Sequence, residues 1–301
     1  MNRRTALRAG FVGVGALAAG CNRRGAPTAS PTVESQHDAL AALEKQLPGR
    51  LGVCALDTGS PASLRYRADE RFLMCSTAKT LSVAAVLQRS AREPGLLDRL
   101  IRYDQADVLE WAPVTSKHVD TGMTVEALCD AAITVSDNTA ANLLVRLLGG
   151  PPAVTTFARS LGDNVTRVDR LEPDLNVTAP GDIRDTSTPG QMALNLRTLV
   201  LGDPLPPAPR TRFADLLKAN TTGGKAIRAG LPRQWVVGDK TGSGAQGESN
   251  DLAIAWPPGR APIVVAVYTA PDDPRVPADR ARQIIARAAT IAASALAPAG
   301  G

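Results

Sequence analysis

The apolar residues of this chain follow a helical spacing through its middle and a strand-like spacing towards its two ends. In the segment 35–49, Leu40, Leu43 and Leu47 recur at intervals that place them on one face of a helix, before a Pro-Gly stop. The apolar run 51–57 follows directly and ends in a turn rich in Gly and Ser, which predicts a strand.

The rest of the chain divides into a helical stretch and a terminal group of strands. Helical spacing recurs at residues 76–90, 124–133, 138–150, 152–162, 190–202 and 209–220. Apolar runs separated by short turns lie at 234–242, 250–257 and 261–270. They predict three strands of an antiparallel meander, and a helix rich in Ala and Arg follows at 276–297. The segment 168–189 shows no clear periodicity, and a loop of that length in a compact domain is usually functional or disordered.

Strands at both ends of a helical middle predict an α/β protein of the α+β type. The economical arrangement is an antiparallel sheet flanked by the terminal helices, formed by residues 35–67 together with 219–297, and an all-helical domain at 68–218. With 301 residues, 44% of them hydrophobic, the chain can bury a core in each part. Because only 3% of the residues are aromatic, Ala, Leu, Val and Ile must build most of that core.

Residues 1–20 predict an export signal, because a basic start precedes an apolar stretch too short to span a bilayer. Arg3 and Arg4 resemble the pair of a twin-arginine signal, which would export the folded protein to the periplasm or the cell surface. The sequence LAAGC resembles a lipoprotein cleavage site with Cys21 as the lipidated residue; cleavage nearby, giving a soluble product, is the alternative. Residues 21–34 are expected to form a flexible tether.

The formal net charge of +5 does not indicate a nucleic-acid-binding protein. Five arginines and no acidic residue lie within residues 1–24, so the remainder of the chain is neutral and has no basic run interleaved with aromatics. Two histidines, His37 and His118, and the lack of a C-x-x-C pair leave no candidate zinc site, and no metal or cofactor is expected. Cys54 lies in an apolar run and is expected to be a buried, inert thiol.

Ser76 and Lys79 form a Ser-x-x-Lys motif at the start of the predicted helix 76–90. A spacing of three residues places both side chains on one face, and the free amides of a helix start favour a negative charge that develops there. A lysine whose charge is disfavoured can take the proton of a neighbouring serine, which would make Ser76 a nucleophile. The motif is common by chance, and Ser76 could equally be an ordinary helix cap.

Ser136, Asp137 and Asn138 directly precede the predicted helix 138–150. All three residue types are favoured at the start of a helix, so a capping run is the ordinary explanation of this motif. The functional explanation gives Ser136 a proton-relay role and gives Asn138 a contact to a substrate amide.

Lys240, Thr241 and Ser243 belong to the sequence KTGSG at the end of a predicted strand. A lysine and hydroxyls in this position can hold a carboxylate and present a backbone N–H group, although an ordinary hairpin turn is the alternative. Residues 242–247 also match G-x-G-x-x-G, but a strand follows instead of the helix that a dinucleotide site requires, so this match predicts no cofactor.

The long loop carries the sequence RLEPDLN. Glu172 and Asn176 could together hold and polarise one water molecule, with Glu172 as general base. Arg170 and Asp185 lie towards the two ends of the loop and could close it by an ion pair. An exposed loop with an ordinary set of charges is the alternative.

In this order, Ser-x-x-Lys, Ser-Asp-Asn, Glu-Pro-x-x-Asn and Lys-Thr-Gly resemble the motif set of the class A β-lactamases. The similarity covers nearly all of the chain from about residue 35 to residue 297, and it is closest to the extended-spectrum and actinobacterial branches of that family. The resemblance implies a five-stranded antiparallel sheet packed with the terminal helices, beside an all-helical domain. It also implies hydrolysis of the β-lactam ring of penicillins and cephalosporins, which gives antibiotic resistance.

The resemblance also implies which residues react. Ser76 would be the acylated nucleophile, Lys79 a proton acceptor beside it, and Ser136 the residue that passes the proton to the lactam nitrogen. Glu172 and Asn176 would supply the water that hydrolyses the acyl-serine. Whether Lys79 or Glu172 is the base of the acylation step is left open.

The substrate-binding residues follow from the same resemblance. They would be Asn138, Asn176, Lys240, Thr241, Ser243, Trp111 and Arg282. The backbone N–H groups of Ser76 and Ser243 would form the oxyanion hole. Trp111 would stand at the entrance, unless it is an ordinary surface or core residue. Ala226 occupies one position where family members carry a carboxylate-binding arginine, and Arg282 matches another, unless it lies on a solvated helix face.

The cysteines and one proline carry further implications. Cys129 and Cys75 match positions that are bridged in some family members, but the partner positions here are Val83 and Gly244, so both thiols are expected to be free. The peptide bond before Pro173 is usually cis in the family, and an X-Pro bond makes that form accessible.

Two other functions are compatible with part of this pattern. A penicillin-binding D,D-peptidase shares the acyl-serine, but it lacks the Glu172–Asn176 pair. An exported lipoprotein that binds β-lactams without turnover would need a deacylation defect or a partner domain, and the sequence shows neither. We therefore expect a serine β-lactamase that acts on small β-lactam substrates as a monomer, with Cys21 as the candidate anchor to a membrane surface.

Overall fold

The computed structural model describes residues 33–177, 179 and 181–297. The export signal and Cys21 lie outside the described residues, and the last two residues of the expected tether belong to the first helix. The helices are α1 (Val33–Glu44), α2 (Lys79–Ser90), α3 (Val125–Thr134), α4 (Asn138–Leu148), α5 (Pro151–Ser160), α6 (Pro189–Leu201), α7 (Pro207–Lys218), α8 (Ile227–Gly230) and α9 (Ala278–Leu296). The strands are β1 (Gly49–Asp57), β2 (Ser63–Tyr66), β3 (Phe72–Leu73), β4 (Leu100–Ile101), β5 (Met123–Thr124), β6 (Thr186–Ser187), β7 (Val236–Ser243), β8 (Ser249–Trp256) and β9 (Ile263–Pro271).

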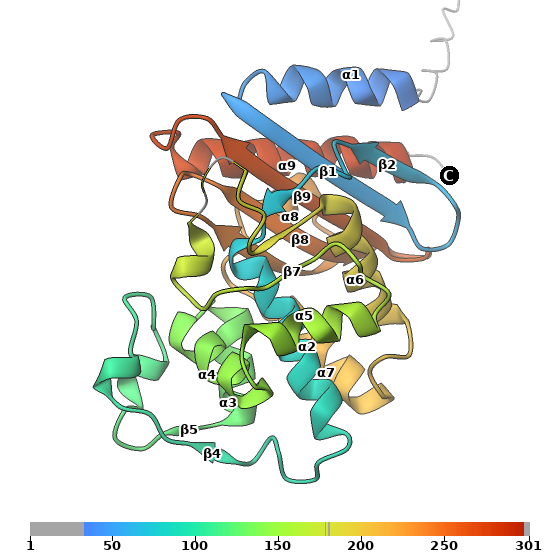
Figure 1. Ribbon diagram of the computed structural model, residues 1–301. Coiled ribbons are helices and arrows are strands. Elements are labelled where there is room, and N and C mark those ends of the chain that lie inside the picture. The colour runs from blue at the N-terminus through green and yellow to red at the C-terminus, as the bar shows by residue number, and fades with distance from the viewer. Residues whose placement is uncertain (1–32, 178, 180, 298–301) are drawn as a thin grey trace, which may run out of the picture. The chain divides into compact units, whose positions relative to one another are not determined.

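The main sheet has five strands in the order β2-β1-β9-β8-β7, and every neighbouring pair is antiparallel. The meander β7-β8-β9 is the one that the three terminal apolar runs predict. Strand β1, from the other end of the sequence, pairs with β9 along its whole length, so strands from both parts of the sequence join one sheet (Figure 1). This sheet and its covering helices confirm the predicted fold class.

Helices cover both faces of the sheet. Helices α1 and α9 pack against each other and on one face, where leucines of α1 such as Leu40 meet Ile285 and Ala289 of α9 and Val265 of β9 in one buried cluster (Figure 1). Helix α6 lies on the opposite face, where a second buried cluster runs on into helices α2 to α5 and α7. Aliphatic side chains (Ala, Val, Leu and Ile) make up most of both clusters, as the low aromatic content requires.

The predicted elements correspond closely to the observed ones, with two kinds of difference. The helix predicted at 76–90 begins as a 3-10 turn, Cys75–Ala78, and becomes α-helical only at Lys79. Strand β2, helix α8 and the short pairs β3–β6 and β4–β5 were not predicted, because two to four residues are too few for a periodic pattern. Pro31–Gly301 forms one compact unit by backbone contacts, and its division into two domains stays a prediction.

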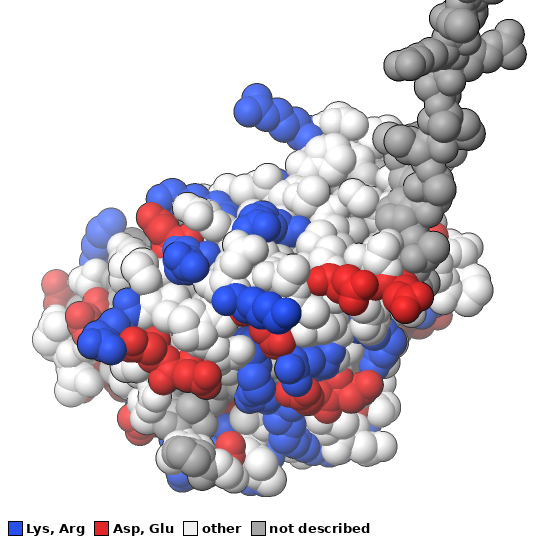
Figure 2. All heavy atoms as spheres, turned by 90° about the horizontal axis from the view of Figure 1, so that it is seen from above, with Lys and Arg blue, Asp and Glu red and all other residues white. Residues whose placement is uncertain are grey.

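Charged residues are mixed on the face that Figure 2 shows, where Lys and Arg side chains lie among Asp and Glu. Ion pairs among the described residues include those of Arg67 with Glu44 and of Arg50 with Glu70. This face therefore offers no continuous basic surface. Within the part of the chain that the structure describes, no helix combines the length and the apolar character needed to cross a membrane.

Candidate active site

A cavity of about 350 Å³ opens where strand β7 meets the 3-10 turn Cys75–Ala78 and the start of α4. Eight of the predicted site residues line it: Ser76, Trp111, Ser136, Asn138, Asn176, Thr241, Ser243 and Arg282. The other three, Lys79, Glu172 and Lys240, are buried. Segments that are up to 206 residues apart in sequence, from Ser76 to Arg282, thus converge on one cavity.

Ser76 lies within the 3-10 turn and is not a helix cap. The N-cap position of the turn is held by Met74, and no side chain accepts a capping hydrogen bond there. The turn packs closely on strand β7: a Cβ atom on Gly242 would lie 2.9 Å from the carbonyl oxygen of Met74 and 3.3 Å from the backbone nitrogen of Ser76. The Ser76 hydroxyl donates a hydrogen bond to Glu172 Oε1 at 3.1 Å. The serine that the motif singled out is therefore in contact with the carboxylate of the long loop.

The Lys79 amine is surrounded by acceptors from two segments. Its Nζ atom donates to the Ser136 carbonyl at 2.9 Å, to Ser136 Oγ at 3.2 Å and to Asn138 Oδ1 at 2.6 Å. It also lies 3.0 Å from Glu172 Oε1, the same oxygen that Ser76 contacts. Burial lowers the pKa of Lys79, while the Glu172 carboxylate acts in the opposite direction.

Within the Ser-Asp-Asn motif, the middle residue caps a helix and the other two contact Lys79. Asp137 caps α4 by accepting from the Ala140 amide at 2.9 Å, and it also accepts from the Thr115 backbone and hydroxyl. Ser136 has a φ of 60°, and Ser136 and Asn138 both contact Lys79. Capping by the middle residue thus fixes its two neighbours towards the cavity.

Lys240 of strand β7 reaches the same cluster from the sheet. Its Nζ atom donates to Ser136 Oγ at 3.0 Å and to the Thr241 carbonyl at 2.9 Å. Burial, with a further contribution from the nearby charge of Lys79, lowers the pKa of Lys240 to about 7. Ser136 Oγ therefore lies between two lysine amines, which is suited to relaying a proton.

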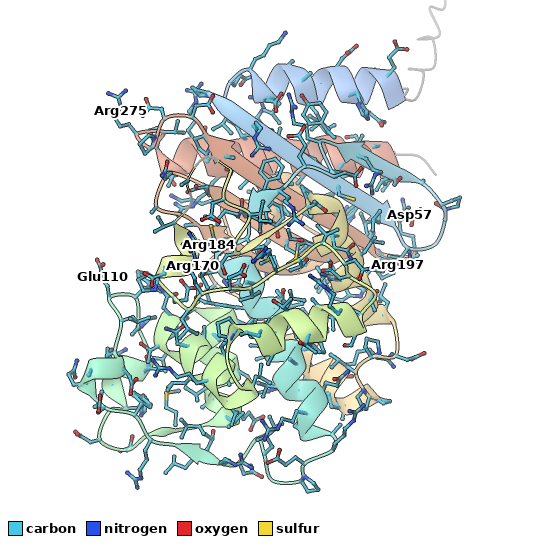
Figure 3. All side chains as sticks on the ribbon, viewed as in Figure 1. Asp57, Glu110, Arg170, Arg184, Arg197 and Arg275 are labelled. Atoms are coloured by element: carbon cyan, nitrogen blue, oxygen red, sulfur yellow. The ribbon has the colours of Figure 1, made fainter. Side chains whose placement is uncertain are left out.

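The long loop is closed as its charges predicted. Arg170 Nε lies 2.6 Å from Asp185 Oδ2, and Asp185 Oδ1 accepts from the backbone amides of Asp169 and Arg170. Figure 3 shows Arg170 on this loop, which passes between the sheet and the helices. The Glu172–Pro173 peptide bond is cis, as expected.

The closed loop holds Glu172 with 4% of its surface exposed. Asn176 donates a short hydrogen bond from Nδ2 to Glu172 Oε2, so each carboxylate oxygen has its own partner. Ala245, in the turn after β7, donates its backbone N–H to the Asn176 carbonyl at 2.9 Å. A second cavity of about 20 Å³, enough for about one water molecule, is bordered by Lys79 and Glu172.

Several residues of this site were not predicted from the sequence. Asn142 brackets the backbone of Glu172, accepting from its N–H at 2.9 Å and donating to its C=O at 2.8 Å. Its position four residues after Asn138, on the same helix, was the available signal. Thr222, whose hydroxyl lies 2.6 Å from that of Thr241, lines the cavity, as do Ser249 and Asn250. Their sequence neighbourhood carried no signal that would have found them.

Trp111 and Arg282, for which the sequence allowed an alternative explanation, both line the cavity. Trp111 is 57% exposed, and its indole N–H donates to the Val135 carbonyl at 3.1 Å. Arg282 donates to Asp279 Oδ1 at 3.0 Å, one turn earlier on α9. Ala226 also lines the cavity, so no arginine reaches it from that position. Among the described residues the cysteines are all free and buried: Cys54, Cys75 and Cys129.

A buried serine and lysine that share one carboxylate oxygen, beside an open cavity, form the arrangement that a serine nucleophile requires. Comparison with known proteins identifies the family. The model of the β-lactamase enzyme family matches residues 35–296. A β-lactamase of Amycolatopsis lactamdurans is 50% identical over 270 residues, which are 90% of this chain and 88% of the relative. The β-lactamase CTX-M-8 of Citrobacter amalonaticus is 50% identical over 252 residues, which are 84% of this chain and 86% of the relative.

The solved structures agree with this family. A class A β-lactamase from Mycobacterium abscessus is 57% identical and superimposes with a TM-score of 0.82, covering 85% of this chain and 97% of that chain. The chain therefore belongs to the β-lactamase enzyme family and is a class A member, which confirms the resemblance that its motifs predicted.

Proposed function

We propose that this protein hydrolyses the β-lactam ring of penicillins and cephalosporins through an acyl intermediate on Ser76, and that it thereby gives resistance to these antibiotics. The observation that carries the proposal is the sharing of Glu172 Oε1 by the Ser76 hydroxyl and the Lys79 amine, with Asn176 on the other carboxylate oxygen. The family of the chain supports it.

In the acylation step, Ser76 Oγ attacks the lactam carbonyl carbon as its proton is taken up. Glu172 is the acceptor already in contact with the hydroxyl, and Lys79, with a lowered pKa, contacts the same oxygen; either group can serve as the base. The developing oxyanion would be held by the backbone N–H groups of Ser76 and Ser243. As the C–N bond breaks, Ser136 would pass a proton to the nitrogen, and Lys79 or Lys240 would reprotonate it.

In the deacylation step, a water molecule must attack the acyl-serine. Glu172, with Asn176 fixing its orientation, would take a proton from that water, and Ser76 would leave as the alcohol. The Glu172–Asn176 pair therefore favours hydrolysis of the acyl-serine. Permanent acylation is the outcome expected of a D,D-peptidase or of a binding lipoprotein.

Substrate would occupy the cavity of about 350 Å³, a volume in the range of small-molecule sites. Lys240, Thr241 and Ser243 would bind its carboxylate, and Asn138 with Asn176 its side-chain amide. Trp111 and Arg282 would contact it at the rim. We further propose export through residues 1–20, with lipidation at Cys21, and function as a monomer.

The test is turnover of a chromogenic cephalosporin by the purified protein, followed by intact mass spectrometry. Continuous hydrolysis, with an acyl adduct on Ser76 that is detected only transiently, is expected. Uptake of one β-lactam per molecule without turnover would refute the hydrolase and support the peptidase or the binding lipoprotein.

A further inference from the structure

The turn between β7 and β8 contains a buried carboxylate that the steps above do not use. Glu248 is 6% exposed, although it lies in a five-residue connection, 244–248, at the edge of the sheet. No ion pair of Glu248 with a lysine or arginine occurs among the described residues. A buried carboxylate without a cationic partner is costly, so its position calls for an explanation by contacts.

The Glu248 side chain folds back under its own turn. Its Oε2 atom accepts a hydrogen bond from the Gln246 backbone N–H at 2.9 Å, while its backbone carbonyl accepts from the Gly244 N–H at 3.0 Å. A Cβ atom on Gly244 would lie 2.2 Å from Glu248 Oε2 and 2.8 Å from its Cδ atom. The carboxylate therefore occupies the space that a side chain at position 244 would need.

The turn that Glu248 holds touches both halves of the reactive cluster. On one side, Ser243 lines the cavity and directly precedes Gly244. On the other side, the N–H of Ala245 binds the carbonyl of Asn176, whose amide binds Glu172. Glu248 is also close to the nucleophile turn: burial raises the pKa of the Cys75 thiol, and the Glu248 carboxylate is the neighbouring charge that raises it most.

We propose that Glu248 is a positioning residue for deacylation, which fixes the turn 244–248 so that Ala245 holds Asn176, and through it Glu172, against the acyl-serine. The inference rests on the proposed hydrolase function. It assigns Glu248 no contact with substrate or with the reacting atoms. Its effect should fall on the hydrolysis of the acyl-enzyme and leave acylation largely intact.

The test compares Glu248→Ala, Glu248→Gln and the exposed control Glu34→Ala in the full-length protein with a chromogenic cephalosporin. Loss of the acceptor in Glu248→Ala should lower kcat about tenfold, since small displacements of catalytic groups carry penalties of that order, and should lower KM with it. The acyl adduct on Ser76 should then accumulate in the mass spectrum. Glu248→Gln keeps an oxygen acceptor in the same place and should restore kcat to within about twofold of the parent.

A second pair of variants tests the same geometry without removing Glu248. Gly244→Ala should displace the carboxylate and reproduce the adduct, whereas Gly224→Ala, which has open space around the added carbon, should behave as the parent. This pair gives the answer if Glu248→Ala does not fold.

Four outcomes would contradict one of the two proposals. A parent that does not turn over refutes the proposed function itself. A parent that turns over, with both Glu248→Ala and Gly244→Ala equal to it in kcat, overturns the inference. A lower melting temperature with unchanged kcat, or a fall in kcat without an accumulating adduct, also overturns it, because either result means that Glu248 stabilises the fold or acts on acylation.

Discussion

The two faces of strand β7 carry buried charged groups of opposite kinds. Lys240 points to the cavity side, where it contacts the Ser136 hydroxyl. Its neighbour Asp239 points to the other side, where Asn220 Nδ2 donates to it at 2.6 Å and Arg228 Nε donates a short hydrogen bond. Burial favours the neutral form of both groups: it lowers the pKa of Lys240 to about 7 and raises the pKa of Asp239.

The two faces differ in what surrounds the buried charge. On the Asp239 face the backbone approaches the carboxylate closely: a Cβ atom on Gly223 would lie 1.9 Å from the Asp239 carboxylate. Asp251 of the next strand lies on this face too, where it accepts from the Ile227 N–H, and burial raises its pKa well above the ordinary value. Lys240 contacts Ser136, which lines the open cavity. Asn220 and Arg228, the partners of Asp239, do not line it. Burial therefore shifts pKa values on both faces, but only the cluster of Lys240 adjoins the cavity.

The largest expected effect comes from removing the carboxylate of Glu172 from the cluster beside the cavity. Glu172→Ala should lower kcat by about 10²- to 10⁴-fold, the usual contribution of a general base, and the acyl adduct should accumulate on Ser76. Steady-state kinetics and intact mass spectrometry measure both. Asp174→Ala, which removes an exposed carboxylate from the same loop, is the matched control. Equal kcat values for the two variants would remove Glu172 from the mechanism.

The next largest effect comes from removing the cation beside Asp239, on the other face of β7. Arg228→Ala leaves the Asp239 carboxylate buried without its cation and should lower the free energy of unfolding by about 3 kcal/mol. Urea denaturation measures this change, with the exposed Arg233→Ala as control. The kcat of the folded Arg228→Ala protein should stay within a few-fold of the parent. A large loss of kcat at unchanged stability would show that both faces of β7 take part in the reaction.

The contrast between the faces is sharpened by pH. Because the pKa of Lys240 is about 7, its amine is cationic below that value and loses its charge above it. The KM for a β-lactam that carries a carboxylate should therefore rise as the pH increases from 7 to 9, by about tenfold. In Lys240→Arg the guanidinium keeps its charge, so KM should be nearly flat over the same range, whatever its absolute value. Parallel pH profiles for parent and variant would contradict the assignment.

The smallest effect concerns the rim of the cavity. Arg282→Ala should raise KM about threefold with little change in kcat, because a charge at a rim contributes mainly to attraction and orientation. Arg275→Ala is the control, since Arg275 lies just before α9, is 88% exposed and projects away from the body of the protein (Figure 3). If both variants match the parent, Arg282 belongs to the solvated helix face that its sequence position also allowed.

The sequence predicted the long elements well and the short ones poorly. Helices α2 to α7 and α9 and strands β1, β7, β8 and β9 each carry enough apolar residues to show a period. The pairs β3–β6 and β4–β5 are two residues long and join segments far apart in the chain, such as Phe72 with Ser187. Their existence depends on neighbours that no local pattern records.

The site followed a similar rule. Ser76, Lys79, Ser136 and Lys240 were found because reactive groups at short, recognisable spacings mark them. Asn142 and Thr222 were missed because their roles are contacts to Glu172 and Thr241, which only the folded chain brings within hydrogen-bonding distance.

The sequence by itself determined which long segments form helices and strands, which family the motifs resemble and which residues are the candidates for nucleophile, base and amines. Only the tertiary structure decided that Glu172 Oε1 receives both Ser76 and Lys79, that Ser136 lies between two lysines, and that Glu248 folds under Gly244. The physical reason is the distance along the chain over which each interaction acts. Helical and strand periodicity follows from local backbone geometry, whereas a buried hydrogen bond or a shifted pKa depends on which distant groups burial brings within a few ångströms.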